Sequence, residues 1–589
     1  MISYLKKILK IAEVTSFKYI TIVLFISISG LLDALVIGLI PISIAAAFEG
    51  SSPIISKLAT FGIPVEHIAE IALFTLLIAS IIKVLVSLSV QYWVVIFISN
   101  KQVQLTKKVV TSFFSLSYLE YLKQEPSKLI QTVVTSIPRF IEEGLHSSIR
   151  LVTEIVVFTL IIATLIIIDT HVAIFLFSMM MVLGILFAFV TRKRSTGYSK
   201  EMLNAQENVI ESARQSIDGF VETKVHNLGS YFVNKIDMSS HRFATTGAKF
   251  YVLQAIPRYL LEFVVVLSFV IGSFWAFSTS ASLVDVGAIA GAFGIGIVRL
   301  IPVINNIINY VNKIRFSEPL LNDIELLLDS LDKSLVKSED NDKFLSKSGS
   351  VDCVTLKGPN VDSFEMLDLA FSYGGGKNIF EGIDFKLVKG DVLGIVGPSG
   401  TGKTTLLKVM LGLLPPGKGT VKVNGVKLVH SSSIDFSREH IMYIPQSCFL
   451  LSASLSENVA LGLAEPDIDL GLVKSSLDRV GLNSLYVDSP EGLNRHVGDS
   501  GRMLSGGQKH RLAISRVLYF DKSILILDEP SAALDLDMTN AIGRLIQDLS
   551  KDRIVIVVTH DQDLMKFCTK KLELNKSSNK GIDNEITLQ

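Results

Sequence analysis

The residues with the clearest chemical meaning form the stretch GPSGTGKTT, at 397–405. It follows the apolar run VLGIV, typical of a buried strand, and precedes TLLKVMLGLL, typical of a helix. A glycine-rich loop in this position lets backbone N–H groups surround phosphate oxygens. Lys403 would reach the β and γ phosphates of a nucleotide, and Thr404 would bind Mg²⁺. The predicted nucleotide-binding residues are Gly397, Pro398, Ser399, Gly400, Thr401, Gly402, Lys403, Thr404 and Thr405.

Two acidic residues, Asp528 and Glu529, end the apolar run SILIL. The pattern predicts a buried parallel strand that delivers two carboxylates at its carboxyl end, where ligands bind in α/β sheets. Asp528 would hold Mg²⁺, and Glu529 would polarise an attacking water. Acidic pairs that only face solvent are common after strands, but a preceding phosphate loop favours the catalytic interpretation.

A second candidate anion site lies in LSGGQ, just before the helix-like run KHRLAISRVL. Backbone N–H groups at the start of a helix lack intrahelical partners and lie at the positive end of its dipole. One chain thus carries two sets of phosphate-binding residues. The second set is Ser505, Gly506, Gly507 and Gln508.

The elements that position these residues lie in the second of two dissimilar halves. The chain has 589 residues, of which 49% are hydrophobic, and its mean hydropathy of +0.47 is too high for an ordinary soluble protein. Long apolar runs fill the chain up to about residue 311, whereas strand and helix patterns alternate after 360. We predict a polytopic α-helical membrane domain fused to an α/β phosphate-loop domain.

Six apolar segments are long enough to cross a bilayer, which takes roughly 20 residues. An even number of crossings puts both chain ends on one side. Basic residues are concentrated in the N-terminus and in the connections 100–136 and 191–250, whereas the alternate connections contain only Lys57. The positive-inside rule therefore predicts a cytoplasmic phosphate-loop domain. The predicted segments are 19–48, 67–99, 137–168, 172–190, 251–278 and 283–311.

The predicted domain order is a membrane domain, a linker, a nucleotide-binding domain and a polar tail. Both long connections have helix-compatible patterns and would extend the membrane helices into the cytosol. The run SEDNDKFLSKSGS has linker composition, and the last residues are expected to fray. The predicted boundaries are 1–315, 316–360, 361–575 and 576–589.

The order of these motifs resembles that of ATP-binding cassette proteins, and six membrane helices before one cassette resemble a half-size exporter. The LSGGQ stretch, between the phosphate loop and LDEP, is similar to the signature of this family. The resemblance implies that Tyr373 stacks on adenine and that Asp535 is the D-loop aspartate. It also implies that Gln446 senses Mg²⁺ and the membrane domain, while His560 contacts the γ phosphate. The implied catalytic residues are Glu529, His560 and Gln446, and the implied Mg²⁺ ligands are Thr404, Gln446 and Asp528.

Three positions differ from the residues that are most common in the motifs of the family. Pro530 stands where alanine is usual, Ala532 where serine is usual, and Asp561 where arginine is frequent. None of the three is a ligand of phosphate, metal or water, so ATP hydrolysis is expected to survive. Ala532 puts the hydrogen bond that the D-loop makes across the two sites in doubt.

The resemblance explains why one chain carries two sets of phosphate-binding residues. In this family the signature residues close on ATP that is held by the phosphate loop of a second subunit. One set of each kind per chain therefore predicts a dimer with two composite sites. Both half-sites have a full set of residues, which favours a homodimer. The expected ligands are ATP and Mg²⁺.

Ionisable residues inside membrane segments are costly and often mark a transport pathway. Lys83, Arg258 and Arg299 lie in three different apolar segments and predict a cavity that accepts an anionic group such as pyrophosphate. Local pairing is the alternative, since Arg258 and Glu262 are one helical turn apart. Together with an amphipathic stretch at 54–61, these features resemble bacterial flippases for oligosaccharides linked to polyprenyl pyrophosphate. The resemblance implies that the three cations face the sugar-pyrophosphate.

The predicted function is ATP-driven export or flipping of an amphipathic, lipid-linked substrate by alternating access, at the plasma (bacterial inner) membrane. A multidrug or peptide exporter is one alternative, for which a more apolar cavity is expected. An ATP-gated channel or regulator is an alternative of another class, and the intact Glu529 and His560 argue against it.

Other classes find no support in the composition. No set of nucleophile, base and orienting acid indicates a protease. The net charge of zero gives no indication of a nucleic-acid partner. The cysteines lack metal-binding spacing and are typical of free thiols in a reducing compartment. They are Cys353, Cys448 and Cys568.

Overall fold

The computed structural model divides the chain into two compact units, which we call the helical unit and the sheet unit. The helical unit comprises Met1–Leu116 and Lys123–Ser334, and the sheet unit comprises Ser117–Leu122 and Leu335–Gln589. The structure describes residues 2–28, 30–32, 68–168, 170–278, 283–335, 361–373, 378–428, 436–437, 439–531, 535–574 and 585–588.

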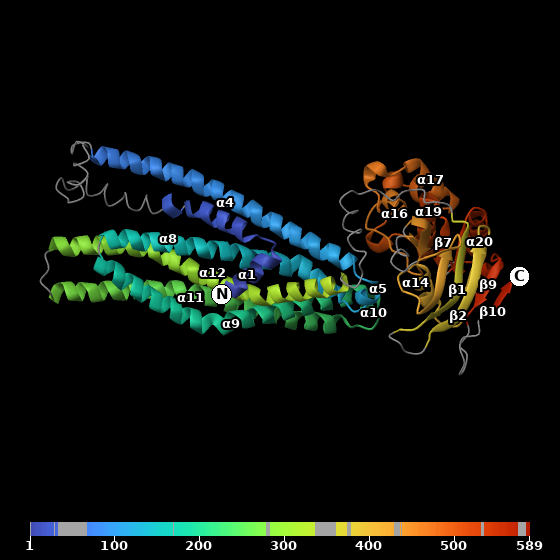
Figure 1. Ribbon diagram of the computed structural model, residues 1–589, viewed down its shortest axis with the longest axis horizontal. Coiled ribbons are helices and arrows are strands. Elements are labelled where there is room, and N and C mark those ends of the chain that lie inside the picture. The colour runs from blue at the N-terminus through green and yellow to red at the C-terminus, as the bar shows by residue number, and fades with distance from the viewer. Residues whose placement is uncertain are drawn as a thin grey trace. The chain divides into compact units, whose positions relative to one another are not determined.

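Long helices make up the helical unit (Figure 1). Their sequences are dominated by Leu, Ile and Val with few internal breakers, so burial or lipid contact rather than a polar face decides their packing. The two predicted long connections are indeed helical, and each contains a short helix at its turn. The helices are α1 (Ile2–Ile11), α4 (Ile68–Phe114), α6 (Pro126–Gln131), α7 (Ile137–Arg139), α8 (Ser147–Ile168), α9 (Thr170–Asp218), α10 (Phe220–Val225), α11 (Gly229–Ser278) and α12 (Leu283–Leu335).

The helix that contains the third predicted membrane segment, 137–168, begins upstream of that segment, at Pro126. Two π-helical stretches interrupt it, at Thr132–Ser136 and Phe140–His146. Pro138 lies between them and has no N–H for the helical ladder, so neighbouring bonds shift to a wider spacing. The N–H of Ile137 accordingly bonds to the carbonyl of Thr132, five residues back.

The core of the helical unit forms where the segment after Pro138 packs against α12. Phe140, Leu145, Leu320 and Leu321 are fully buried there. Much of α4, by contrast, has exposed leucine and isoleucine side chains; Leu88 is 64% exposed. Apolar surface of this extent is expected to meet lipid or another protein surface.

Two helical stretches among the described residues are long and apolar enough to cross a membrane, Leu73–Phe114 and Pro126–Ala163. A third is added if Tyr4–Ile11 and Ser16–Leu32, which meet at 104°, form one broken span. The predicted segments 172–190, 251–278 and 283–311 lie within α9, α11 and α12, whose side chains there are described only in part. Residues 33–48 of the first segment and the amphipathic stretch at 54–61 lie outside the described residues. Six crossings therefore stay a prediction.

The predicted start of the linker at residue 316 is wrong. Helix α12 continues to Leu335, and Phe316 and Ile324 are buried in the core of the helical unit. Composition alone does not distinguish a helix that mixes polar and buried apolar residues from a linker.

The predicted membrane domain also includes a short stretch that belongs to the sheet unit. Helix α5 (Tyr118–Tyr121) lies between two parts of the helical unit in sequence. Its Tyr118 packs on the core of the sheet unit, and the Lys408 ammonium lies 4.9 Å from the centre of the tyrosine ring. Cation–π contact and burial explain why these few residues join the other unit.

The sheet unit contains a parallel sheet and an antiparallel sheet. In the larger sheet the strand order is β10-β9-β3-β8-β7-β6, and all pairs except β10 with β9 are parallel. The smaller sheet has the order β2-β1-β4-β5. The strands are β1 (Ser363–Phe371), β2 (Phe380–Val388), β3 (Val392–Val396), β4 (Lys418–Val423), β5 (Val426–Lys427), β6 (Ile441–Ile444), β7 (Ile524–Asp528), β8 (Ile554–Val558), β9 (Lys570–Glu573) and β10 (Glu585–Leu588).

The predicted frayed tail is wrong for β10. This strand pairs with β9 in antiparallel register, with Ile586 opposite Leu572. Polar and apolar residues alternate in EITL, as in a strand with one buried face, and this strand lies at the edge of the sheet. The helices that cover the sheets are α14 (Lys403–Met410), α16 (Leu455–Val459), α17 (Leu470–Arg479), α18 (Ser484–Val487), α19 (Gly506–Phe520), α20 (Leu536–Ser550) and α21 (Gln562–Met565).

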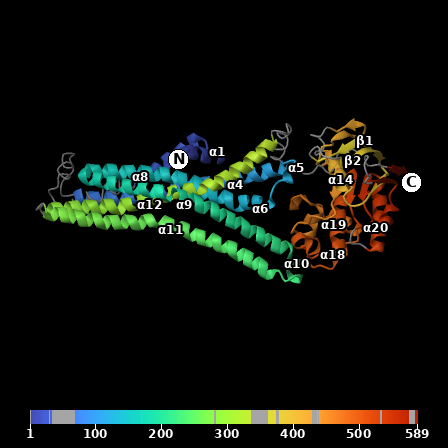
Figure 2. The same cartoon turned by 90° about the horizontal axis from the view of Figure 1, so that it is seen from below.

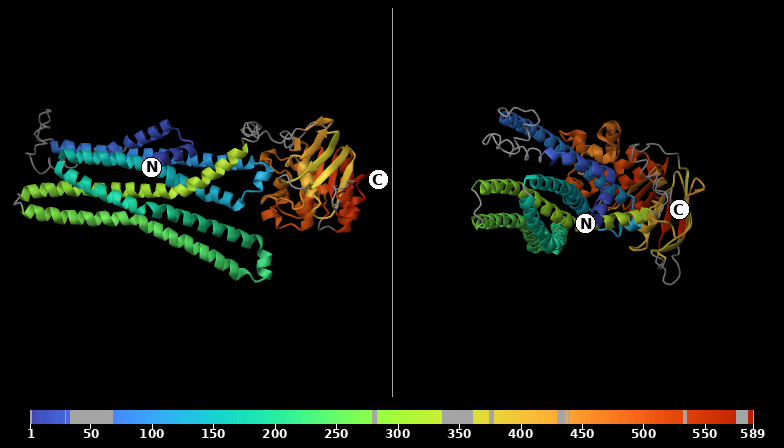
Figure 3. Two further views of the ribbon diagram at one scale, coloured as in Figure 1. Left: turned by 60° about the horizontal axis from the view of Figure 1, so that its bottom comes forward. Right: turned by 60° about the vertical axis from the view of Figure 1, so that its left-hand side comes forward.

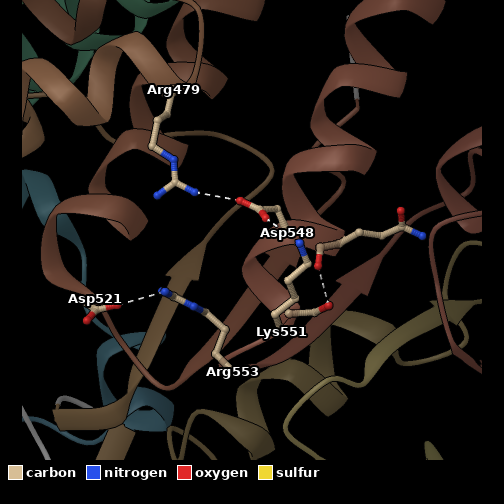
Figure 4. Close-up of polar contacts among 7 residues, drawn as sticks. Arg479, Asp521, Asp548, Lys551 and Arg553 are labelled. Carbon is tan, nitrogen blue, oxygen red and sulfur yellow. Dashed lines mark hydrogen bonds and ion pairs between the residues drawn. The ribbon is translucent and has the colours of Figure 1, made fainter.

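Ion pairs join surface elements of the sheet unit (Figure 4). The carboxylate of Asp548, on α20, accepts from Arg479 of α17 at 3.0 Å and from Lys551 at 3.1 Å. Arg553 pairs with Asp521 at 2.9 Å, at the end of α19. The two pairs of Asp548 are exposed, and exposed pairs contribute little to stability.

Candidate functional site

The phosphate loop has the predicted form, with strand β3 before it and helix α14 after it. Gly402 caps the helix in the left-handed conformation, at φ 95°. Gly397 has φ 152°, and a Cβ there would lie 2.4 Å from the Leu574 carbonyl oxygen. Only glycine fits either position, because the backbone is left-handed at both and packed tightly against neighbours. The loop is therefore built for close approach of a ligand to the backbone.

Lys403 lies over the loop that it follows. Its ammonium donates to the carbonyl oxygens of Gly397 at 2.6 Å and Pro398 at 3.0 Å. Burial lowers the pKa of Lys403, while the carboxylates of Glu529 and Asp528 act in the opposite direction. A mostly buried ammonium beside a backbone cradle suits an anion that neutralises it.

Asp528 and Glu529 emerge from the fully buried strand β7. Burial raises the pKa of Asp528, and the charge of Glu529 acts in the same direction. Glu529 adopts φ 51°, unusual for a residue with a side chain. Its N–H donates to the Val558 carbonyl at 2.8 Å, which holds this conformation. Backbone strain of this kind is often found at functional sites.

Three loops meet at the carboxylate of Glu529. The Gln446 amide donates to Glu529 Oε2 at 2.5 Å, and His560 Nε2 lies 3.5 Å from Oε1. These residues follow β6, β7 and β8, which are adjacent parallel strands, so their carboxyl ends share one edge of the sheet. The three predicted catalytic residues are thus brought together. A carboxylate oriented by an amide donor and faced by an imidazole can orient and polarise a water.

The signature residues begin helix α19 as predicted. Ser505 Oγ accepts from the N–H of Gln508 at 3.2 Å, and the Gln508 side chain accepts from the N–H of Ser505 at 2.9 Å. This capping box leaves the N–H groups of Gly506 and Gly507 without helical partners. Within the described part of the chain, no hydrogen bond or ion pair joins these residues to 397–405.

Tyr373 and Asp535 have local roles in the structure. Tyr373 is 42% exposed and stands edge-on to Phe371 at the end of β1, with 5.0 Å between ring centres. Phe371 is the described ring contact of Tyr373. Asp535 caps α20, where its Oδ1 accepts from the N–H of Met538 at 2.8 Å.

The structure explains part of the differences from the residues usual in the family's motifs. Asp561 caps the short helix α21, since its Oδ1 accepts from the N–H of Asp563 at 2.9 Å. Pro530 is buried directly after Glu529. Ala532 lies outside the described residues, so the D-loop hydrogen bond stays untested.

Two residues that the sequence reasoning missed touch this site. The Tyr443 hydroxyl lies 3.4 Å from Asp528 Oδ2, and His510 Nε2 lies 3.0 Å from the Gln446 carbonyl oxygen. Burial raises the pKa of Tyr443, so its hydroxyl stays protonated and donates. The sequence signal was the position of Tyr443 three residues before Gln446, on the same strand and turn.

The predicted cations of the membrane cavity are not joined into one site by the described contacts. Arg258 is exposed on α11 and pairs with Glu262 at 3.0 Å, which is the local pairing alternative. Lys83 is half-buried on α4. Arg299 lies in α12, and its side chain is outside the described residues.

A polar stripe on the third segment was missed. Glu142, His146, Arg150 and Glu154 recur every four residues along this helix, which is the signal that was available. Arg150 Nε lies 3.2 Å from His146 Nε2, and its guanidinium also contacts Gln91 of α4.

The stripe reaches other helices of the same unit. His146 Nδ1 lies 3.5 Å from Glu142, and Glu154 accepts from the Asn306 amide of α12 at 2.9 Å. Polar groups on three helices thus form one cluster. We call Gln91, Glu142, His146, Arg150, Glu154 and Asn306 the polar cluster.

Comparison with known proteins finds similarity in both units. Residues 380–532 match the ABC transporter family. The ATP-dependent lipid A-core flippase of Cupriavidus pinatubonensis is 36% identical over 194 residues, which are 33% of this chain and 33% of that protein. The chain thus aligns with about a third of the length of the first relatives that it matches. A protein of the same name from Paraburkholderia xenovorans is 24% identical over 475 residues, covering 79% of this chain and 75% of the relative.

A solved structure resembles the whole chain. It is a bacterial Atm1-family ABC exporter with ATP bound, with a TM-score of 0.69, 17% identity, and coverage of 95% of this chain and 94% of that chain. At this identity the likeness concerns the fold. The predicted fold class, a helical membrane region with an α/β cassette, is confirmed by this match.

Proposed function

Because this chain carries an ABC transporter domain and has the fold of an ABC half-exporter, we propose that it hydrolyses ATP to move an amphipathic substrate across a membrane. The observation that carries the proposal is the meeting of Gln446 and His560 on the carboxylate of Glu529. A nucleotide regulator without turnover has no need of an oriented carboxylate beside its phosphate loop.

The phosphate loop supplies the binding half of the site. Its backbone N–H groups and Lys403 hold the phosphates of ATP, and Tyr373 offers an exposed ring for the adenine. Thr404, Asp528 and Gln446 provide the oxygen ligands that Mg²⁺ prefers. A buried Asp528 with a raised pKa beside Glu529 fits a cation, because a nearby positive charge offsets the cost of two close carboxylates. The ion would neutralise charge on the phosphates.

Glu529 orients the attacking water, and its two partners hold it in place. Gln446 fixes one carboxylate oxygen, while His560 faces the other. His560 is also half-exposed, which leaves it accessible to the γ phosphate. The proton of the attacking water passes towards Glu529 Oε1 or Oε2.

The signature residues act on the ATP of a second copy. Support comes from the free N–H groups at the start of α19 and from the lack of described contacts between 505–508 and 397–405. A second copy would supply its phosphate loop to this helix end, and this chain would do the same in return. The working unit is then a homodimer with two composite sites.

Alternating access follows from this arrangement. ATP stabilises the closed pair of cassettes because it contacts both copies, and hydrolysis with product release reopens them. The short helices α5 and α10, at the turns of the two connections, are the elements that pass the motion to the membrane helices. The sheet unit lies in the cytoplasm and the helical unit in the bacterial inner membrane.

For the substrate we propose a lipid-linked oligosaccharide on a polyprenyl pyrophosphate. Relatives named as flippases of lipid A-core support a lipid-anchored cargo. Lys83, Arg258 and Arg299 supply cations for the pyrophosphate. The polar cluster, on α4, the π-helical stretch Phe140–His146, α8 and α12, adds amide, imidazole and carboxylate groups that hydrogen-bond sugar hydroxyls.

A vesicle assay tests the function and the substrate together. The protein is reconstituted with a fluorescent polyprenyl-pyrophosphate oligosaccharide in one set of vesicles and with a hydrophobic cationic drug in another. We expect ATP-dependent movement of the glycolipid only, and none with Glu529→Gln. Movement of the drug alone would favour the multidrug alternative, and no movement of either together with no ATPase activity would favour a channel or regulator.

A further inference from the structure

An open cavity of about 350 Å³, most of whose lining residues are solvent-exposed, lies in the helical unit between α9 and α11. From α9 it is lined by Glu201, Asn204, Ala205 and Asn208, which recur at the spacing of one helix face. The two helices run side by side and are joined through α10 (Figures 2 and 3). The cavity therefore lies between two regular helices of the same chain.

The α11 wall carries two cations, Lys235 and Arg242. They are seven residues apart, or about 10 Å along the helix axis. The chain reverses at α10, and the contact of Lys235 with Gln215 places that cation towards the α10 end of the lining, with Arg242 further along α11. Ser239 lies between the two cations on the same wall. The lining thus offers a cation at each end and hydrogen-bonding groups between them.

The charge of these cations is not neutralised locally. Lys235 donates to the neutral amide of Gln215 at 3.3 Å. In the stretches of α9 and α11 that the structure describes, neither Lys235 nor Arg242 has a carboxylate within 4 Å. The nearby Glu211 is already paired with Arg214 at 3.3 Å. With Glu201 as the one carboxylate in the lining, the cavity has an excess of positive charge.

We propose that this cavity binds a small organic anion with two or more separated carboxylate or phosphate groups. One anionic group lies at Lys235, and another lies at Arg242. Asn204 and Ser239 hydrogen-bond the middle of the ligand, and Glu201 accepts from a hydroxyl. The bound anion bridges α9 and α11 and stabilises this helix pair, since it binds only when both walls are in place.

Citrate is the probe, and binding is measured by calorimetry on the full-length protein in detergent. All samples carry Lys403→Ala, which removes the ammonium of the phosphate loop as a competing anion site. We expect saturable binding of one citrate per chain. Lys235→Met and Arg242→Gln should each raise the dissociation constant of citrate at least tenfold. Lys249 is an exposed cation on the same helix outside the cavity, and Lys249→Ala should change the dissociation constant by less than twofold.

Two further arms keep the test decisive. Ala205→Leu adds bulk at the buried floor and keeps every charge, so it should abolish citrate binding. The melting temperature of the ligand-free variant is measured alongside, because a larger buried side chain has a packing cost. Inorganic phosphate, with a single anionic group, should bind at least tenfold more weakly than citrate. The proposal is overturned if millimolar citrate shows no saturable binding, if Lys249→Ala weakens it as much as Lys235→Met, or if phosphate binds as well as citrate.

Discussion

The two units keep their apolar side chains in different places. Every residue of β7 and β8 is buried, so the sheet unit has a core that the chain completes by itself. Along α4, by contrast, Leu77 is 57% exposed and Leu85 is 61% exposed. The sheet unit is stabilised by its own packing in water. The helical unit leaves its apolar surface for lipid or a second copy to cover.

The units also differ in how their polar chemistry is arranged. In the sheet unit, parallel strands bring Gln446, Glu529 and His560 to one edge, and short motifs in the sequence mark each of them. In the helical unit, polar groups are spread over several helices and meet only through packing. The reaction is therefore far easier to infer than the cargo.

The largest expected effect is on the sheet unit's chemistry. Glu529→Gln removes the carboxylate that we propose polarises the attacking water, so ATP turnover should fall by a factor of about 100 to 10,000. Phosphate release from the purified protein measures it, and trapped nucleotide should accumulate in a closed dimer. Glu491→Gln, an exposed change in the same unit, is the matched control. A Glu529→Gln protein that still cycled normally would remove Glu529 from its role.

A second prediction separates the two units. Replacing Arg258 and Arg299 together by alanine should stop glycolipid transport, while the basal ATPase activity stays largely intact, because neither residue belongs to the ATP site. Arg194→Ala, on another helix, is the control. Glu262→Gln breaks the ion pair of Arg258 and should leave transport working. Unimpaired transport by the double variant would contradict the cavity hypothesis.

Stability measurements test the difference in packing directly. Ile526 is fully buried in β7, so Ile526→Ala should lower the free energy of unfolding by about 2–5 kcal/mol. Leu85→Ala, on the exposed face of α4, should change it by less than about 0.5 kcal/mol. Thermal unfolding of each variant in detergent compares them. An equally large loss for Leu85→Ala would mean that another protein surface covers that face of α4.

Thiol reactivity gives a smaller effect within the sheet unit. Burial raises the pKa of Cys568 to about 11 from a usual value of 9.0. Since the thiolate is the reactive form, alkylation at pH 8 should be about 100-fold slower than for a free thiol peptide. Mass spectrometry of the Cys568 peptide after timed labelling measures the rate. Labelling as fast as the peptide control would show that this region opens readily.

The smallest effect is expected at the surface ion pairs of Figure 4. The hydrogen bond from Lys551 and the charge of Arg479 hold the pKa of Asp548 below its usual value, so its stabilising contribution is present above the unfolded pKa and is lost as the pH falls through the folded pKa. The carboxylate is exposed and screened by solvent. Asp548→Asn should therefore leave the melting temperature at pH 7 almost unchanged, with Glu491→Gln again as the control. A clear drop would mean that Asp548 has a structural partner beyond these two cations.

Local sequence was sufficient to predict the phosphate loop, the carboxylates after β7 and the start of α19. Each depends on a few adjacent residues whose backbone conformation or capping is decided within one strand, turn and helix. The two apolar spans among the described residues were also predictable, because lipid selects for length and hydropathy alone.

Tertiary structure alone decided what joins residues that are far apart in the chain. Examples are the contact of Tyr443 with Asp528, the docking of α5 on the sheet unit, the pairing of β10, and the polar cluster between α4, α8 and α12. Composition reads 316–335 as a linker, yet Ile324 is buried. In each case the deciding free energy comes from burial and hydrogen bonds with partners that the local sequence does not specify.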